Sequence, residues 1–302
     1  MNPRSADEPP TPRHVGTFTP SFVSVLIPVY NGETVLPAQL RALTQQDFDG
    51  NWEVVVADNG STDGTRAAAA AFAEALPDLR IVDASDIKGP SHARNIAADV
   101  AKGDLLLFCD ADDVVAPGWM SALVTAAARA ELLIGVGVVT RTPERDSVAG
   151  PDHTPIPTSY RFLPWGRTSN LAVHREAFER VGGFDEQRRF GEDADLCWRI
   201  QLAGYRFAFV PEAYAAFRDW GTPREVWTRQ WAFGKAAPRL YADFAADGAP
   251  SDSLRMVFGD LLRLAVRTPV WLLTADGRLR WWMQLAGLAG RGVGILKLRF
   301  SA

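Results

Sequence analysis

The sequence predicts a doubly wound α/β fold with a mostly parallel sheet, followed by a helical C-terminal extension. Two observations carry this prediction. Apolar runs of strand length alternate with helical stretches over the first 130 residues, and each run stops at turn-forming or acidic residues. The 302-residue chain is 47% hydrophobic and 23% charged, which is ordinary for a globular protein with a large core. We therefore expect strands buried on both faces and joined by right-handed helical crossovers.

The expected elements follow in chain order. The stretch 22–30 is β-branched and almost wholly apolar, and the helix after it spaces Leu36, Leu40 and Leu43 at helical intervals. Three further strands are expected at 52–58, 79–84 and 104–109, with helices from Arg66 to about Leu76 and at 91–103 between them. Beyond them we expect a strand at 131–141, a loop at 142–158, a strand and a helix ending at Gly182 and Gly183, another helix, and a last strand at 207–217.

Composition divides the chain into three parts: a Pro-rich, disordered lead-in at 1–20, an α/β domain at 21–235 and the helical extension at 236–302. From Leu254 onward the chain carries a net charge of +6, which leaves about −10 for the rest of the chain. The acidic charge of this larger part argues against nucleic acid as a partner. This tail is also rich in Trp. Two interpretations stay open: it binds an anionic membrane surface, or it packs on the α/β sheet with its Arg side chains in solvent.

Cysteine usage and the N-terminus bear on location. Only Cys109 and Cys197 are present, both in apolar stretches, so no disulfide framework or CxxC metal site is expected. The first residues lack the pattern of a signal peptide, and no stretch reaches the roughly 20 apolar residues of a membrane span. We expect a cytoplasmic protein, with peripheral attachment to the inner face of the cell membrane as the alternative.

Two carboxylates follow the strand at 104–109. Asp110 and Asp112 stand at i and i+2, where the carboxyl end of a parallel strand opens onto the ligand crevice of such sheets. Mg²⁺ or Mn²⁺ prefers such oxygen ligands, often with phosphates and water completing its coordination. The alternative is that these residues merely favour a turn.

A second acidic cluster lies at the start of the helix beginning near residue 192. Glu192, Asp193 and Asp195 exceed what stabilisation of a helix N-terminus requires. A carboxylate at such a junction is well placed to act as a general base on a substrate hydroxyl.

Three other side chains fit a nucleotide. Tyr30 could stack on a base, Asp58 could accept a hydrogen bond from a base, and Arg94 could contact phosphate or base. The structural alternatives are an aromatic residue at the edge of the core for Tyr30, a turn residue for Asp58 and a surface charge for Arg94. The sequence has no GxGxxG after the first strand, no P-loop, no GxSxG elbow and no HExxH.

Five blocks in this order resemble the family 2 glycosyltransferases of the GT-A fold: VSVLIPVYNGE, VVVADNGSTDGT, GPSHARNIAADVAKGDLLLFCDADD, SNLAVHREAFERVGGFDE and GEDADLCWRIQLAGY. The resemblance runs from about Val23 to Phe217. It implies an inverting transferase that uses a nucleotide-diphosphate sugar, with a UDP-sugar favoured, and Mg²⁺ or Mn²⁺. Its acceptor would be a glycan, a lipid-linked molecule or another glycoconjugate.

The resemblance also implies roles for residues of this sequence. The nucleotide would be contacted by Pro28, Tyr30, Asp58, Arg94 and Asp110, and the metal would be held by Asp110 and Asp112. The catalytic base would be Asp193. The acceptor side would be formed by Trp165, Glu192 and Asp195.

One departure concerns the metal. Many relatives have a His soon after the last strand, whereas this chain has Phe217 and Arg218 there, and Arg218 could assist the diphosphate instead.

The alternative function is a homologue that binds a sugar nucleotide or glycan without turnover, which the intact carboxylates disfavour. A sugar nucleotidyltransferase is disfavoured too, because PVYNGET lacks the Gly-rich basic loop of that class.

Overall fold

The structure is a computed structural model that describes residues 18–140, 160–218 and 222–300. Described residues 18–140, 164–187 and 192–218 belong to a first compact unit, and 160–163, 188–191 and 222–300 belong to a second. Most of the expected lead-in and the expected loop at 142–158 lie outside the described residues. The boundary expected after residue 235 falls inside helix α7 (Pro223–Asp243), which belongs to the second unit.

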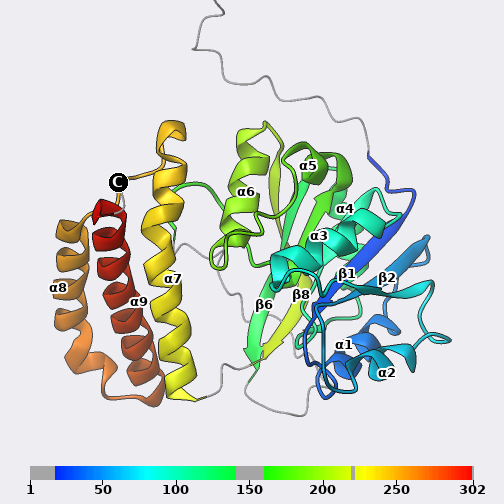
Figure 1. The fold of residues 1–302 in the computed structure, drawn as a ribbon, viewed down its shortest axis with the longest axis horizontal. Helices are drawn as coiled ribbons and strands as arrows, with labels where there is room; N and C mark the ends of the chain where they lie inside the picture. Colours follow the sequence, from blue (N-terminus) through cyan, green and yellow to red (C-terminus); the bar gives the residue numbers. More distant parts are fainter. Residues whose placement is uncertain (1–17, 141–159, 219–221, 301–302) are drawn as a thin grey trace, which may run out of the picture. The chain divides into compact units, whose positions relative to one another are not determined.

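The described part of the first unit contains an eight-stranded sheet (Figure 1). Its order is β3 (Leu79–Asp83), β2 (Trp52–Asp58), β1 (Val23–Val29), β4 (Leu105–Phe108), β7 (Leu171–His174), β6 (Leu132–Thr140), β8 (Phe207–Arg218) and β5 (Val114–Val115). The strands from β3 to β4 are parallel, as is the pair β6 and β8, whereas β7 and β5 run antiparallel to their neighbours. The predicted α/β class with a mainly parallel sheet is confirmed.

Helices cover both faces of this sheet because its central strands are apolar on both sides. Alternate residues of β1, among them Val25 and Ile27, join one core with α1 (Leu36–Leu43), α2 (Thr65–Ala70) and α4 (Trp119–Ala127). On the other face Phe108 of β4 packs against Phe178 of α5 (Arg175–Arg180) and against Phe184. Helices α3 (Pro90–Val100) and α6 (Glu192–Leu202) complete the unit.

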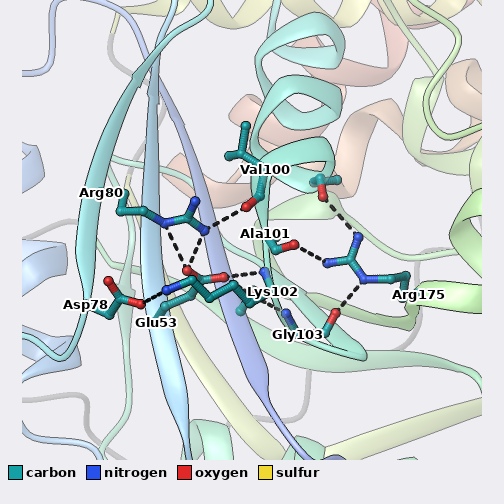
Figure 2. Close-up of polar contacts among 10 residues, drawn as sticks. Glu53, Asp78, Arg80, Val100, Ala101, Lys102, Gly103 and Arg175 are labelled. Carbon is teal, nitrogen blue, oxygen red and sulfur yellow. Dashed lines mark hydrogen bonds and ion pairs between the residues drawn. The ribbon is translucent and has the colours of Figure 1, made fainter.

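A buried carboxylate ties together the amino-terminal ends of the parallel strands (Figure 2). Glu53 in β2 is 0% exposed; it accepts hydrogen bonds from Ser24 Oγ at 2.7 Å, Arg80 Nε at 3.0 Å and the Lys102 backbone N–H at 2.5 Å. Arg80 also donates to the Val100 carbonyl at the end of α3. Paired charge and hydrogen bonds make this burial tolerable. The opposite, carboxyl-terminal ends of the strands are therefore where a ligand crevice is expected.

The second unit is helical in its described part, and Figure 1 shows its long helices side by side. These are α7, α8 (Leu254–Trp271) and α9 (Ala275–Phe300). A capping box between Thr222 and Glu225 begins α7. Helices α7 and α9 approach closely, because a Cβ on Gly234 would stand 2.0 Å from the Gly287 carbonyl oxygen. No described helix combines the length and apolar character that crossing a bilayer requires.

Candidate active site

The first unit gathers the turns that follow β1 and β2 at one edge of the sheet. These strands are parallel, with Val29 opposite Asp58, so both chains leave the sheet at the same end. The Asn31 side-chain oxygen accepts a hydrogen bond from the Thr62 backbone N–H at 2.8 Å, and the Ser61 hydroxyl accepts one from the Asn31 N–H at 2.9 Å. Asn31 has a φ of 51°, a left-handed conformation that Asn tolerates better than most residues. The two turns form one continuous rim.

The residues expected to meet the nucleotide stand along this rim in different environments. Pro28 is buried within β1, whereas Tyr30 is 59% exposed directly after the strand. Asp58 is 2% exposed and accepts from the Ser61 N–H at 2.9 Å and from Arg66 Nη1 at 3.1 Å. Burial raises the pKa of Asp58, but the hydrogen bonds from Ser61 and Arg66 outweigh burial and hold the pKa below its ordinary value. Asp58 is therefore held as a carboxylate.

Arg94 connects the two acidic clusters that the sequence singles out. It lies on α3, its side chain is 5% exposed, and its Nη2 donates to Asp110 Oδ1 at 2.8 Å. Its Nη1 lies 3.6 Å from Glu192 Oε1 at the start of α6. One buried guanidinium thus faces the carboxylates after β4 and those opening α6. Asp110 and Glu192, which were expected to share one cleft, therefore lie on the same guanidinium.

Gly89 sets the position of Arg94. Its φ of 143° and ψ of 151° are accessible to glycine but strained for other residues, and Pro90 begins α3 directly after it. The Gly89 N–H donates to the Asn59 side-chain oxygen at 2.9 Å, which fixes the start of α3 against the turn after β2.

Asp193 is a carboxylate with a raised pKa. Burial, followed by the negative charge of Glu192, raises its pKa from 3.8 to about 7, although the Ala194 N–H donates to it at 2.8 Å. Burial also raises the pKa of Glu192, and the neighbouring Arg94 charge opposes that rise. A carboxylate whose pKa lies near neutrality accepts a proton more readily than an ordinary one and is still ionised in part at neutral pH.

The carboxylates after β4 offer a small oxygen set. Asp110 is 33% exposed, and within the described residues its Oδ2 accepts no hydrogen bond while Oδ1 is held by Arg94. Asp112 is half-buried two residues later. No described cluster contains three or more metal-ligating side chains. Two protein oxygens suit Mg²⁺ or Mn²⁺, which commonly take one or two carboxylates and complete their shell with phosphate and water.

Two residues expected on the acceptor side are deeply placed. Asp195 is 4% exposed, and its Oδ2 accepts from Arg199 Nε at 2.8 Å and Nη2 at 2.6 Å. Arg199 also donates to the Val181 carbonyl, so this pair anchors α6 to the preceding Gly-Gly turn. Trp165 is 8% exposed, which is the environment of a core aromatic. Glu192, the third residue expected on the acceptor side, instead lies beside Arg94 at the start of α6.

Arg167 acts on Asp193, and the sequence did not single it out as an individual residue. Its charge acts on Asp193 and lowers the pKa of that carboxyl, and its guanidinium carbon lies 5.3 Å from the centre of the Phe217 ring. A basic residue two positions after Trp165 in PWGRTSN was the available signal. The Arg218 side chain lies outside what the structure describes.

Comparison with known proteins identifies the class. Residues 24–189, more than half of the chain, match the sequence profile of glycosyl transferase family 2, and residues 152–288 match that of glycosyl transferase family group 2. The chain belongs to glycosyl transferase family 2, so the resemblance seen in the sequence is confirmed. It is a glycosyltransferase.

Individual relatives agree. Glycosyltransferase AglE of Haloferax volcanii is 30% identical over 233 residues, which cover 74% of this chain and 76% of the relative. The pre-mycofactocin glycosyltransferase of Mycobacterium tuberculosis is 29% identical over 229 residues, 72% of this chain. This chain spans only 47% of that mycobacterial relative.

Solved structures share the fold. The mannosyltransferase PcManGT of Pyrobaculum calidifontis, in complex with GDP-Man and Mn²⁺, superposes with a TM-score of 0.62 at 21% identity, covering 93% of this chain and 88% of that one. Residues 1–349 of S. aureus TarS, in complex with UDP-GlcNAc, give a TM-score of 0.54 at 17% identity, covering 92% of each chain. The fold is of the GT-A type.

Proposed function

We propose that this glycosyltransferase moves a sugar from a nucleotide-diphosphate donor to an acceptor hydroxyl with inversion, using Asp193 as the general base. The observation that carries the proposal is the position of Arg94, which contacts Asp110 and lies beside Glu192 while its charge acts on Asp193. The carboxylates proposed for the donor side and for the base side therefore lie around one guanidinium. A single displacement needs both on opposite sides of one sugar carbon.

In the proposed reaction Asp193 takes the proton from the acceptor hydroxyl as its oxygen attacks the anomeric carbon. The new carbon–oxygen bond forms as the bond from that carbon to the diphosphate breaks, and the nucleoside diphosphate leaves with the bonding electrons. Attack from the face opposite the leaving group inverts the configuration. Removal of the proton by a positioned carboxylate contributes about 10²- to 10⁴-fold to the rate.

Asp110 and Asp112 would hold Mg²⁺ or Mn²⁺ together with the donor diphosphate. When bound, the cation would neutralise the charge that gathers on the departing diphosphate. The Oδ2 atom of Asp110, which accepts no hydrogen bond from the described residues, supports this assignment. So does the similarity to a mannosyltransferase solved with GDP-Man and Mn²⁺.

The donor's nucleoside would lie along the rim formed by the turns after β1 and β2. The exposed Tyr30 ring offers a stacking surface, and the fixed carboxylate of Asp58 offers an acceptor for a base N–H. A UDP-sugar is the favoured donor, with a GDP-sugar as the alternative because structural neighbours were solved with each. Glu192 would contact an acceptor that is a glycan or a lipid-linked molecule.

The test compares two conservative variants. Candidate UDP- and GDP-sugars are first screened for Mn²⁺-dependent thermal stabilisation of the wild type. With the donor found, Asp193→Asn should bind it as the wild type does and lose about 10²- to 10⁴-fold in transfer and slow donor hydrolysis. Asp112→Asn should instead weaken donor binding in Mn²⁺ much more than in EDTA.

Near wild-type turnover by Asp193→Asn would show that the base is another residue. If the wild type bound a donor but neither hydrolysed nor transferred it with any acceptor mixture, the protein would be a binding homologue without turnover. Equal donor binding by Asp112→Asn and wild type in Mn²⁺ would remove the metal assignment.

A further inference from the structure

We propose that the outward face of α8 binds the surface of an anionic membrane. This inference does not depend on the transfer reaction. Helix α8 packs on α9 and buries Val257 and Leu264. Its other side is also apolar: Phe258 is 64% exposed, Leu262 54%, Val266 80%, Val270 67% and Leu273, just past the helix, 78%.

These five residues, the α8 stripe, form one surface because of their spacing. Phe258, Leu262, Val266 and Val270 recur every four residues, and Leu273 continues the row. A helix packed on the surface of a globular protein ordinarily turns polar residues outward. A contiguous row of large apolar side chains facing water instead marks a place where another apolar phase or partner is met.

The charges beside the stripe identify the partner. Arg263 and Arg267 flank it on α8, and Arg255 stands at the start of the helix. All three are exposed, and Arg263 is 74% exposed even while its guanidinium contacts Asp260. Within the described residues Arg255 and Arg267 form no ion pair. An apolar strip bordered by arginines suits the boundary between acyl chains and anionic headgroups.

The same charges disfavour a second copy of the chain as the partner. A symmetric pair would bring each stripe against itself and set its arginines near the equivalent arginines of the other copy. Anionic lipid suits both parts of this surface, because its acyl chains can contact the apolar stripe while its headgroups contact the arginines. Arg278 and Arg280, at the start of α9, are also exposed and extend the basic character of this unit.

Trp281 and Trp282, two tryptophans of the Trp-rich tail, make their contacts within this unit. Trp281 Nε1 donates to Thr268 Oγ1 at 2.9 Å, and Trp282 Nε1 donates to the Pro223 carbonyl at 3.0 Å. The Trp282 ring lies 4.5 Å from that of Trp227. These side chains hold the helices together, so the membrane contact belongs to the α8 stripe.

The test is co-sedimentation of the full chain, without donor, with vesicles of phosphatidylcholine plus phosphatidylglycerol and with vesicles of phosphatidylcholine alone. The wild type should bind the anionic vesicles, and salt should weaken the binding. The double variant Val266→Gln, Val270→Gln should need about tenfold more lipid for half-maximal binding or show none, because affinity scales with the apolar area inserted. Gln has at least the helix propensity of Val, so the helix is preserved.

The matched control is Val100→Gln, which replaces a 38% exposed Val at the end of α3 in the first unit and should bind vesicles as the wild type does. Circular dichroism establishes that each variant is folded. Equal binding by the double variant and wild type, or no wild-type binding at low salt, would overturn the proposal. A wild-type dimer that the double variant converts to monomer would also overturn it, because the stripe would then be covered by a second copy.

Discussion

Replacing Asp193 with Asn should stabilise the folded protein relative to the wild type, and this gain should be larger at high pH than at low pH. The pKa of Asp193 is raised from 3.8 to about 7 by burial and by the charge of Glu192. Each pKa unit corresponds to about 1.4 kcal/mol, so ionised Asp193 lowers the free energy of unfolding by about 4 kcal/mol. An unfolded chain loses this proton near pH 3.8, and the folded one keeps it to about pH 7. This group therefore makes the free energy of unfolding of the wild type fall by about 4 kcal/mol as the pH rises through that window.

Asn has the same shape and cannot ionise, so its advantage over Asp must grow with pH. We expect Asp193→Asn to gain about 2 kcal/mol over the wild type from this effect at pH 5, and about 4 kcal/mol at pH 8. Urea unfolding of both proteins at the two pH values measures the difference, and any change in stability that does not depend on pH cancels in the comparison. Wild-type turnover should correspondingly rise with pH up to about 7. A stabilisation equal at pH 5 and pH 8 would refute the raised pKa and the burial argument for the base.

Two further predictions concern packing and pH. Gly290→Ala should lower the free energy of unfolding by about 1–3 kcal/mol, because a Cβ there would stand 2.0 Å from the Trp231 carbonyl oxygen. Gly292→Ala is the control, because a Cβ there meets nothing within 4 Å, and it should raise the free energy of unfolding by up to about 1 kcal/mol. Thermal unfolding of both variants tests this pair. Changes in stability of the same sign would contradict the close approach at Gly290. Although burial lowers the pKa of His92, its contacts with Glu186 at 2.9 Å and with a second carboxylate raise it overall. The resulting stabilisation is present below pH 6.5 and is lost as the pH rises through the pKa of the folded protein. His92→Gln should therefore lower the free energy of unfolding, measured in urea, by more at pH 5.5 than at pH 8.5. A larger loss at pH 8.5 would exclude the ion pairs.

The strands were largely predictable because their signal is local. The apolar runs at 22–30, 52–58 and 104–109 correspond to β1, β2 and β4, and the turn residues after them mark where the chain leaves the sheet. The helix expected from Arg66 to about Leu76 ends earlier, at Ala70. The chain continues from there in turns, with hydrogen bonds between residues three or four apart. Strand β5 has only two residues, too few for any sequence period to reveal it.

The chemistry of the site was predictable in kind. Carboxylates after an apolar strand and at the start of a helix are visible in DADD and GEDAD. The resemblance to the family is carried by five sequence blocks and is confirmed by the family profile. Their environments were not visible. Asp193 and Asp195 stand two residues apart in the same motif, yet the pKa of Asp193 is raised to about 7 while Asp195 is bound to Arg199.

What differs between such neighbours is set by residues distant in the chain. The sequence left open whether Arg94 contacts a nucleotide or is a surface charge near a helix start. It is a buried guanidinium because β4 and α6 bring Asp110 and Glu192 to it. The basic, Trp-rich tail was evident from composition, whereas folding turned Trp281 and Trp282 into packing contacts and left the α8 stripe outside. Sequence period and composition specify which elements form and which chemical groups they carry. Burial, and with it the pKa values and the exposed surface, depends on which elements pack together.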